Sequence, residues 1–177
     1  VLGLIIICVL VFCALFPGVV APYDPITQDY GSTFLPPLSE GKDGGPMHLF
    51  GTDEFGRDIF SRVVYGCQTS LQIGLISVAI SCVIGVIVGC IAGYYGGVID
   101  NLFMRGIDIL MAIPVTMLGI SIVAAFGQST SNLILAIALG SVCPYARLVR
   151  VSVLTEKDRE YVEAARATGA SDARIIM

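Results

Sequence analysis

The stretch 71–93, LQIGLISVAISCVIGVIVGCIAG, decides the fold class. It contains no charged residue, and its length matches the roughly 20 apolar residues that a helix needs to cross the hydrocarbon core of a bilayer. The stretch therefore predicts a transmembrane helix, and the regions on either side of it are interpreted as parts of a membrane protein.

Small side chains recur at every fourth position of this stretch. They are Ser77, Ser81, Gly85, Gly89 and Gly93. Residues four apart lie on one face of a helix, and a strip of small residues lets two helix backbones approach closely in lipid. The strip predicts helix packing. A second interpretation, in which this helix lines a pathway or lies beside a moving partner, stays open.

Three further apolar stretches predict membrane spans, at residues 1–16, 107–126 and 133–154. The first ends at Pro17, and a signal-peptide core is its alternative interpretation. Pro114 and Pro144 are expected to break the backbone hydrogen-bond ladders of the other two, where membrane helices tolerate proline as a kink.

The composition fits a membrane protein. Of the 177 residues, 55% are hydrophobic and 14% are charged, whereas soluble domains carry about 25% charged residues. The net charge of -4 gives no basic excess that would bind nucleic acid. Six cysteines without a C-x-x-C pair predict buried apolar side chains rather than a disulfide framework or a metal site. We expect an all-α, polytopic membrane protein without bound metal, truncated at both ends.

Basic residues are divided unevenly between the two sides of the predicted spans. One side carries Lys42, Arg57 and Arg62, and the other carries Arg105, Arg147, Arg150, Lys157, Arg159, Arg166 and Arg174. An excess of Lys and Arg marks the cytoplasmic side of a membrane protein. We therefore expect residues 20–66 to lie outside the cell and residues 155–177 to lie in the cytoplasm.

Three charged residues lie within or close to the predicted spans. Asp108 is expected to pair with Arg105, three residues earlier on the same helix face, and a proton relay is the alternative. Arg147 and Arg150 are expected to reach the cytoplasmic headgroups, with substrate contact as the alternative. The single histidine, His48, has no evident partner in the sequence.

The chain ends in a charged, alanine-rich segment. Thr155 with Asp158 predicts the capped start of a helix. Gly169 predicts its left-handed stop, and Ser171 predicts the cap of a second, short helix. The small alanine face would let the first helix seat deeply in a groove of another protein. A solvated helix that merely connects two spans is the alternative.

Several motifs resemble one transporter family. The sequence Glu163-Ala164-Ala165, followed by Gly169, resembles the E-A-A-x-x-x-G signature of type I ABC importer permeases. Four other segments resemble the peptide and nickel branch of that family, in particular its C-type subunit. They are 48–62 (HLFGTDEFGRDIFSR), 93–97 (GYYGG) with Asp100, 108–114 (DILMAIP) and 144–150 (PYARLVR). The resemblance runs in order along essentially the whole chain.

The resemblance implies the type I ABC transporter transmembrane fold. Its parts would be a first helix at 1–19, an extracytoplasmic loop at 20–66 and a partial transmembrane domain at 67–177. The segment 155–177 would couple transport to an ATPase. The residues that the resemblance assigns to coupling are Tyr161, Glu163, Ala164, Ala165, Arg166 and Gly169.

The same resemblance implies a permease subunit of a binding-protein-dependent importer for dipeptides or oligopeptides, in the inner membrane of a bacterium or archaeon. Its partners would be a second, homologous permease, two ATP-binding subunits and an extracytoplasmic substrate-binding protein. The chain has no G-x-x-x-x-G-K-[ST] loop, so the partner subunits would use the ATP and this chain would bind no cofactor.

Other classes of protein remain as alternatives. A nickel-chelate permease is the alternative within the same family. A secondary transporter would share this hydropathy but would normally carry ionisable residues near the middle of the membrane. No catalytic constellation appears in the sequence, so we expect no enzyme activity in this chain.

Overall fold

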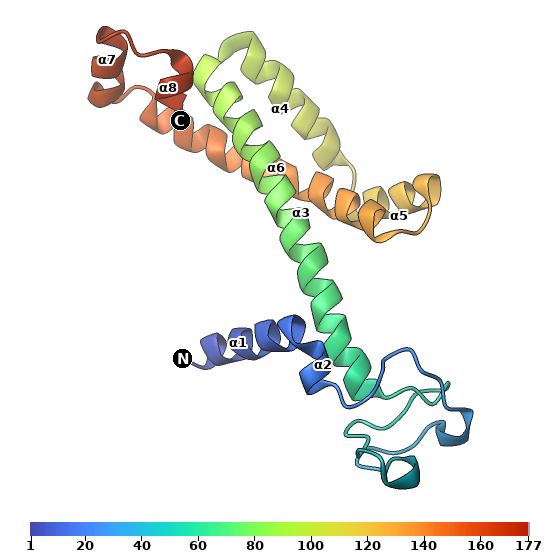
Figure 1. Ribbon diagram of the computed structural model, residues 1–177. Coiled ribbons are helices and arrows are strands. Elements are labelled where there is room, and N and C mark those ends of the chain that lie inside the picture. The colour runs from blue at the N-terminus through green and yellow to red at the C-terminus, as the bar shows by residue number, and fades with distance from the viewer. Residues whose placement is uncertain (177) are drawn as a thin grey trace. The chain divides into compact units, whose positions relative to one another are not determined.

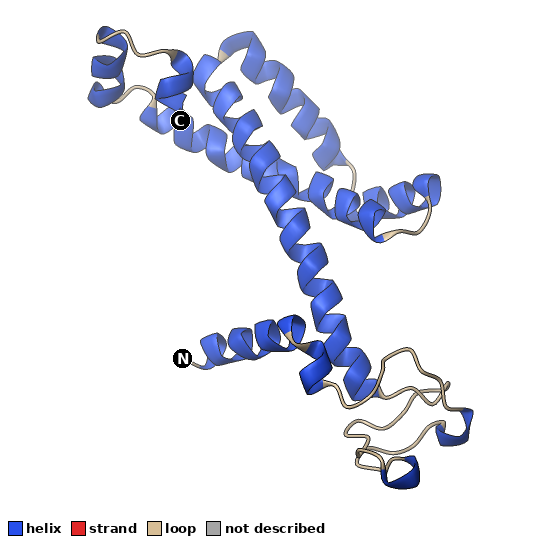
Figure 2. Ribbon diagram, in the orientation of Figure 1, coloured by secondary structure: helices blue, strands red, loops and turns tan. Residues whose placement is uncertain are grey.

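The computed structural model describes residues 1–176, and it consists of helices joined by loops (Figures 1 and 2). The predicted all-α class is confirmed, because pairing between extended segments in the described part is limited to two isolated bridges. The chain forms two compact units that divide after Gln72, a few residues beyond the predicted loop boundary at 66. Each unit is described separately.

The first unit begins with helix α1 (Leu2–Leu15) and the single turn α2 (Pro17–Val20). Pro17 occupies the first turn of α2, a position that proline favours because its missing N–H would have no partner there. Two short 3-10 helices, η1 (Tyr30–Ser32) and η2 (Lys42–Gly44), interrupt the loop that follows.

Helix α3 (Ile59–Tyr95) begins directly after Asp58. The Asp58 carboxylate accepts a hydrogen bond from the backbone N–H of Ser61 at 2.7 Å, which is the usual geometry of an aspartate N-cap. Asp58 thus satisfies a backbone N–H in the first turn of α3.

The second unit contains the rest of α3, followed by five helices. They are α4 (Gly97–Ala112), α5 (Val115–Phe126), α6 (Thr130–Glu156), α7 (Glu160–Ala167) and α8 (Asp172–Ile176). A sharp turn joins α3 to α4, and Gly96 and Gly97 take φ values of +65° and +54° there, in the region that glycine enters at little cost.

The five small residues of α3 pack against α6, and Figure 1 shows the two helices crossing. The Ser81 hydroxyl donates a hydrogen bond to the carbonyl oxygen of Ala138 at 3.0 Å, and the Ser77 hydroxyl donates to that of Ile134 at 3.4 Å. Both serines are fully buried. The close contact between the two helices thus provides a hydrogen-bond acceptor for each serine hydroxyl of the strip.

The glycines of the strip leave no room for a side chain. A Cβ atom added at Gly89 would lie 2.6 Å from the Ala146 carbonyl oxygen, and one at Gly93 would lie 2.9 Å from Cβ of Val153. One at Gly85 would meet the side chain of Tyr145. Backbone-to-backbone contact of this kind is what small residues permit in membrane helices.

The predicted third span is not one straight helix. The apolar run is divided between α4 and α5, whose axes differ by 85°. Ile113 is extended, with φ -92° and ψ 121°, because the ring of the following Pro114 disfavours the helical conformation at the residue before it. Helix α4 also begins earlier than the sequence predicted, at Gly97 rather than near residue 107.

Pro144 has a different effect from Pro114. It lies inside α6, which continues on both sides of it, so the ladder loses the bond of the proline nitrogen without ending the helix. The residues around it are tightly packed: Cys143 and Ala146 are 2% and 0% exposed and form a core with Ile107 of α4. This packing holds the helix together across the missing hydrogen bond.

In the described part, α3 and α6 are long and apolar enough to cross a membrane. The bent pair α4 and α5 provides a third crossing if it counts as one span. Helix α1 is apolar but has 14 residues, so the four spans predicted from the sequence correspond to two full helices, one bent pair and one short helix.

We predict that the contact between α3 and α6 makes Gly89→Ala destabilising. The added methyl group overlaps the backbone of α6, and overpacking of this kind costs about 1–3 kcal/mol. Gly74→Ala is the matched control on the same helix, because a Cβ atom added at Gly74 would have no neighbouring atom within 4 Å. Thermal unfolding of the detergent-purified, full-length transporter measures both variants. Equal melting temperatures for the two would contradict the prediction.

Candidate functional site

The C-terminal segment is the first candidate site, and its start differs from the prediction. Helix α6 extends to Glu156, and α7 begins at Glu160 with Arg159 as its N-cap residue. Thr155 is therefore inside α6, where its hydroxyl donates to the carbonyl oxygen of Val151 at 3.0 Å. The predicted cap at Thr155 is wrong, because this hydroxyl bonds back into its own helix.

The end of α7 follows the prediction. Gly169 has a φ of +83°. Its N–H donates to the carbonyl oxygen of Arg166 at 3.0 Å, and the N–H of Ala170 donates to that of Ala165 at 3.1 Å. This pair of bonds is the Schellman motif, which ends helices at a left-handed glycine. Helix α8 then begins directly after Ser171, so the predicted helix, glycine turn and short helix are confirmed. Met177 lies outside the described residues.

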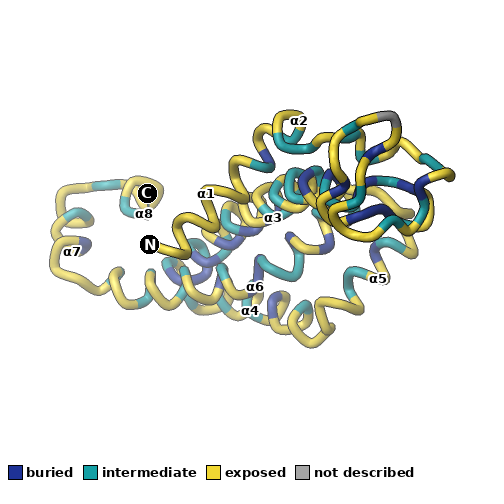
Figure 3. Tube along the Cα trace, turned by 90° about the horizontal axis from the view of Figure 1, so that it is seen from below, coloured by how far each residue is buried: buried dark blue, intermediate teal, exposed yellow. Residues whose placement is uncertain are grey.

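Most of α7 is open to solvent (Figure 3). Glu163, Ala164 and Arg166 are exposed, Ala165 is half-buried, and Val162 turns inward at 6% exposure. The structure thus keeps one face of the E-A-A motif free of contacts within this chain.

Tyr161 connects α7 to the end of α6. Its hydroxyl donates to Glu156 Oε2 at 2.7 Å, and this hydrogen bond to a carboxylate raises the pKa of Tyr161. Tyr161 therefore binds the end of α6 through its hydroxyl, although the residue as a whole is 62% exposed.

A second attachment joins the segment to the end of α3. The Tyr94 hydroxyl donates to Asp172 Oδ1 of α8 at 2.7 Å. The Arg166 guanidinium of α7 lies 5.4 Å from the centre of the Tyr94 ring, within the range of a cation–π interaction. One aromatic side chain of α3 thus contacts both short helices.

Charged residues of α4 and α6 pair across the two helices. Arg150 binds both carboxylate oxygens of Asp100, at 2.5 and 2.6 Å, and Arg147 forms an ion pair with Asp108. The predicted pair of Asp108 with Arg105 is therefore wrong, because Asp108 pairs with Arg147. Both arginines bind carboxylates of α4, and their contact with headgroups stays a prediction. The acids and arginines meet because α4 packs beside α6, which spacing along one helix could not reveal.

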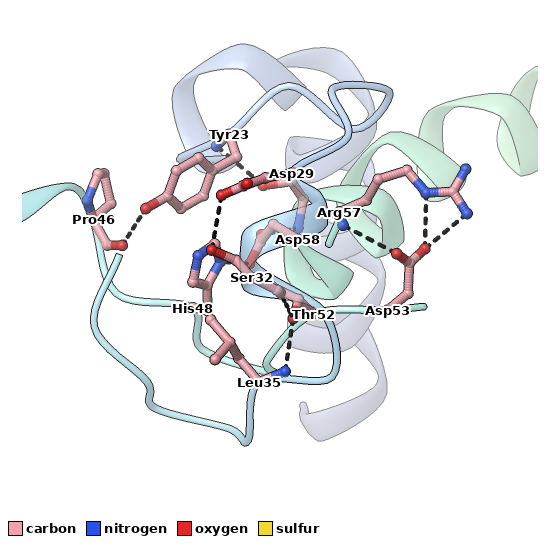
Figure 4. A network of polar contacts seen from close by, with 11 residues as sticks. Tyr23, Asp29, Ser32, Leu35, Pro46, His48, Thr52, Asp53, Arg57 and Asp58 are labelled. Carbon is pink, nitrogen blue, oxygen red and sulfur yellow. Dashed lines mark hydrogen bonds and ion pairs between the residues drawn. The ribbon is translucent and has the colours of Figure 1, made fainter. Parts of the chain in front are cut away.

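In the first unit, the loop before α3 contains a buried polar network (Figure 4). His48 Nδ1 lies 2.9 Å from Asp58 Oδ1, and both side chains are almost fully buried. The Tyr23 ring stacks on the imidazole with centroids 4.6 Å apart. The prediction that His48 has no partner is wrong, since the two bridges Ser39–His48 and Thr52–Asp58 bring distant loop residues together.

Aspartates organise the turns of this loop. Besides Asp58, three of them accept backbone N–H groups a few residues along the chain: Asp24, Asp29 and Asp53. These are the bonds by which aspartate stabilises turns.

Within the described residues no group of three or more His, Cys, Asp and Glu side chains is placed to hold a metal ion.

Two of these carboxylates have lowered pKa values. Hydrogen bonds from Lys42 and Ser32 and from the Gly31 backbone hold the pKa of Asp29 at about 2. For Asp53, desolvation raises the pKa, but bonds from the Arg57 side chain and from the Arg57 and Phe55 backbone outweigh it and lower the pKa to about 2. Both groups stay ionised throughout the neutral and mildly acidic range.

Two protein-family models match this chain. The model of the family described as "Binding-protein-dependent transport system inner membrane component" matches residues 85–177, and that of the "N-terminal TM domain of oligopeptide transport permease C" matches residues 1–37.

Three relatives are similar along nearly the whole chain. The dipeptide transport system permease protein DppC of Haemophilus influenzae is 41% identical, covering 99% of this chain and 59% of the relative. The di/tripeptide transport system permease protein DppC of Pseudomonas aeruginosa is 42% identical, covering 98% of this chain and 57% of the relative. The glutathione transport system permease protein GsiD of Escherichia coli is 44% identical, covering 95% of this chain and 54% of the relative. The chain thus spans somewhat more than half the length of these relatives.

We predict that the loop network loses stability in strong acid. A carboxylate whose pKa is lowered by folding stabilises the fold above its unfolded pKa of about 3.9, and that contribution is lost as the pH falls through the folded value. For Asp29 and Asp53 the loss falls between about pH 4 and pH 2. Hydrogen exchange of the loop amides, labelled at each pH and corrected for the intrinsic rate, measures it.

Asp53→Asn is the matched variant for this experiment. The loop amides of this variant should be less protected from hydrogen exchange at pH 7, because the asparagine side chain cannot form an ion pair with Arg57. Their protection should also change less between pH 4 and pH 2, because asparagine does not titrate in this range. Identical pH profiles for the variant and the unsubstituted protein would argue against a role of Asp53 in stabilising this loop.

Proposed function

Since this chain belongs to the family of binding-protein-dependent transport system inner membrane components, we propose that it is a permease subunit of an ABC importer for peptides. The names of the three relatives support this cargo, because they are described as dipeptide, di/tripeptide and glutathione permeases. For the same reason we favour peptides over nickel chelates. The proposed location is the inner membrane, with residues 20–66 outside and residues 155–177 in the cytoplasm.

The exposed E-A-A face of α7 carries the coupling part of this proposal. Glu163 and Ala164 make no contact with the rest of the chain that would cover them, and the left-handed Gly169 fixes where the helix ends. A short helix with a small-residue face suits insertion into a groove of another protein. The proposed occupant of that face is one of two ATP-binding subunits, and a second permease and a substrate-binding protein would complete the importer.

The attachments of α7 and α8 suggest how movement would reach the membrane. Helix α7 follows α6 after a turn of three residues and is fastened to it by Tyr161 and Glu156. Tyr94 fastens both short helices to the end of α3. A displacement of the short helices by a closing ATPase pair would therefore act on two spanning helices at once, and these helices are already packed on each other.

A reconstitution experiment tests the proposed function. Full-length permease, its partner permease, the ATPase subunits and the binding protein, placed in proteoliposomes, should take up a labelled dipeptide only when ATP is present. Uptake that continues without ATP would overturn the proposal and indicate a secondary transporter.

We predict that Glu163→Lys lowers dipeptide uptake about tenfold or more, because it places a positive charge in the proposed interface, where a mismatched charge costs several kcal/mol. Assembly in the membrane should be unchanged, since Glu163 is exposed in this chain. Glu54→Lys in the outer loop makes the same change in net charge and should leave uptake normal. Normal uptake by Glu163→Lys would remove the E-A-A face from the coupling mechanism.

Gly169→Pro tests the same segment through its backbone. Proline fixes φ near -65°, whereas Gly169 has a φ of +83°, so α7 and α8 would be reoriented. We predict ATP hydrolysis without uptake, measured in the same proteoliposomes. Uptake in proportion to ATP hydrolysis, as in the unsubstituted transporter, would contradict this prediction.

Tyr94→Phe tests the attachment to α3. The variant keeps the ring under Arg166 but loses the hydrogen bond to Asp172. We predict a several-fold rise in the ATP hydrolysed per dipeptide transported, with unchanged assembly. Tyr95→Phe, on the neighbouring exposed residue, is the matched control and should behave like the unsubstituted protein. Equal coupling ratios for the two variants would show that the Tyr94 hydroxyl does not transmit the movement.

A further inference from the structure

The two ion pairs between α4 and α6 differ sharply in exposure. The side chains of Asp100 and Arg150 are 15% and 29% exposed, as expected of a pair that holds two helices together. Those of Asp108 and Arg147 are 61% and 47% exposed. The second pair therefore joins the helices but also presents both of its charges outward.

The exposed pair lies far from the start of α4 and from the end of α6. Asp108 is about eleven residues after the start of α4 at Gly97, which is about 16 Å at 1.5 Å per residue. Arg147 is about nine residues before the end of α6 at Glu156, or about 14 Å. Half of a hydrocarbon core is about 15 Å. The pair thus lies about half a hydrocarbon core away from the start of α4 and from the end of α6.

At such a depth an exposed ion pair is costly against lipid. Ionisable side chains within spans face a bundle interior or a water-filled cavity. The apolar neighbours on other faces of the same helices, Ile109 and Leu148, are 68% and 66% exposed and suit contact with lipid. The exposed cation Arg105, one turn before Asp108, adds to the polar face.

We propose that the Asp108–Arg147 pair faces the aqueous pathway and contacts the two charged ends of a passing peptide. This proposal rests on the proposed function of a peptide permease. The pair consists of the groups that complement a zwitterion: the Arg147 guanidinium binds a terminal carboxylate with two parallel hydrogen bonds, and the Asp108 carboxylate accepts hydrogen bonds from a terminal ammonium.

The exchange conserves net charge and replaces one internal ion pair with two ion pairs to the peptide. Before the peptide arrives, Asp108 and Arg147 neutralise each other. When both bind the peptide, each has a new partner of the same charge as the old one, and the peptide's two ends are neutralised as well. A neutral substrate offers neither charge a new partner and would leave the internal pair closed, so the site favours molecules that carry both charges.

Thiol labelling in membranes tests whether this face meets water. Arg147→Cys should react with a charged, membrane-impermeant methanethiosulfonate in inside-out vesicles holding the whole transporter. Leu148→Cys, on the adjacent exposed apolar face, should not react above the level of the unsubstituted chain, whose own cysteines set the background. An unreactive Arg147→Cys variant would overturn the proposal, and this result does not depend on what the transporter carries.

Uptake in proteoliposomes tests the contact with substrate. Asp108→Asn should lower the uptake of a labelled dipeptide about tenfold while leaving the melting temperature of the complex unchanged, whereas Asp100→Asn should lower the melting temperature. Arg147→Lys keeps the positive charge and should retain part of the uptake. Unchanged dipeptide uptake in both Asp108→Asn and Arg147→Lys would overturn the substrate contact. Absence of ATP-dependent uptake in the unsubstituted transporter would instead overturn the proposed function.

Discussion

The contact on which the second unit depends is the close approach of α3 and α6 along the strip of small residues. It brings backbone against backbone at Gly85, Gly89 and Gly93, and it lets two buried serines donate to carbonyl oxygens of the facing helix. In lipid there is little hydrophobic gain from bringing two helices together, so packing and such hydrogen bonds have to supply the stability. A side chain at any of these three glycines would push the two helices apart.

The same contact determines where the functional segments lie. Because α3 and α6 are held together up to Gly93 and Val153, the next residue of α3, Tyr94, can reach α8. The continuous α6, in turn, carries Arg147 and Arg150 opposite the acids of α4. The short helices α7 and α8 and the acids of α4 are thus attached to one packed pair of helices.

Local sequence signals predicted the features that depend on neighbouring residues. The four-residue period identified the packed face of α3, and Gly169 marked a helix end because it acts through its own backbone. Pairings between distant segments were not predictable. Asp108 has a plausible partner three residues away, yet it binds a residue of another helix, and His48 meets Asp58 only because the loop folds back on itself.

The two prolines show why the remaining features depend on tertiary structure. Both remove one backbone donor, and both restrict the residue before them. At Pro114 that residue is extended and the chain turns by 85°, since the surroundings of Ile113 leave it 41% exposed. At Pro144 the preceding Cys143 is buried against α4 and stays helical. Each proline disfavours the helical conformation at the residue before it, and the packing of that residue decides whether the helix bends there. Because the chain bends by 85° after α4, this helix ends at Ala112, shortly beyond Asp108. The face of α4 that carries Asp108 is therefore not continued by a straight helix.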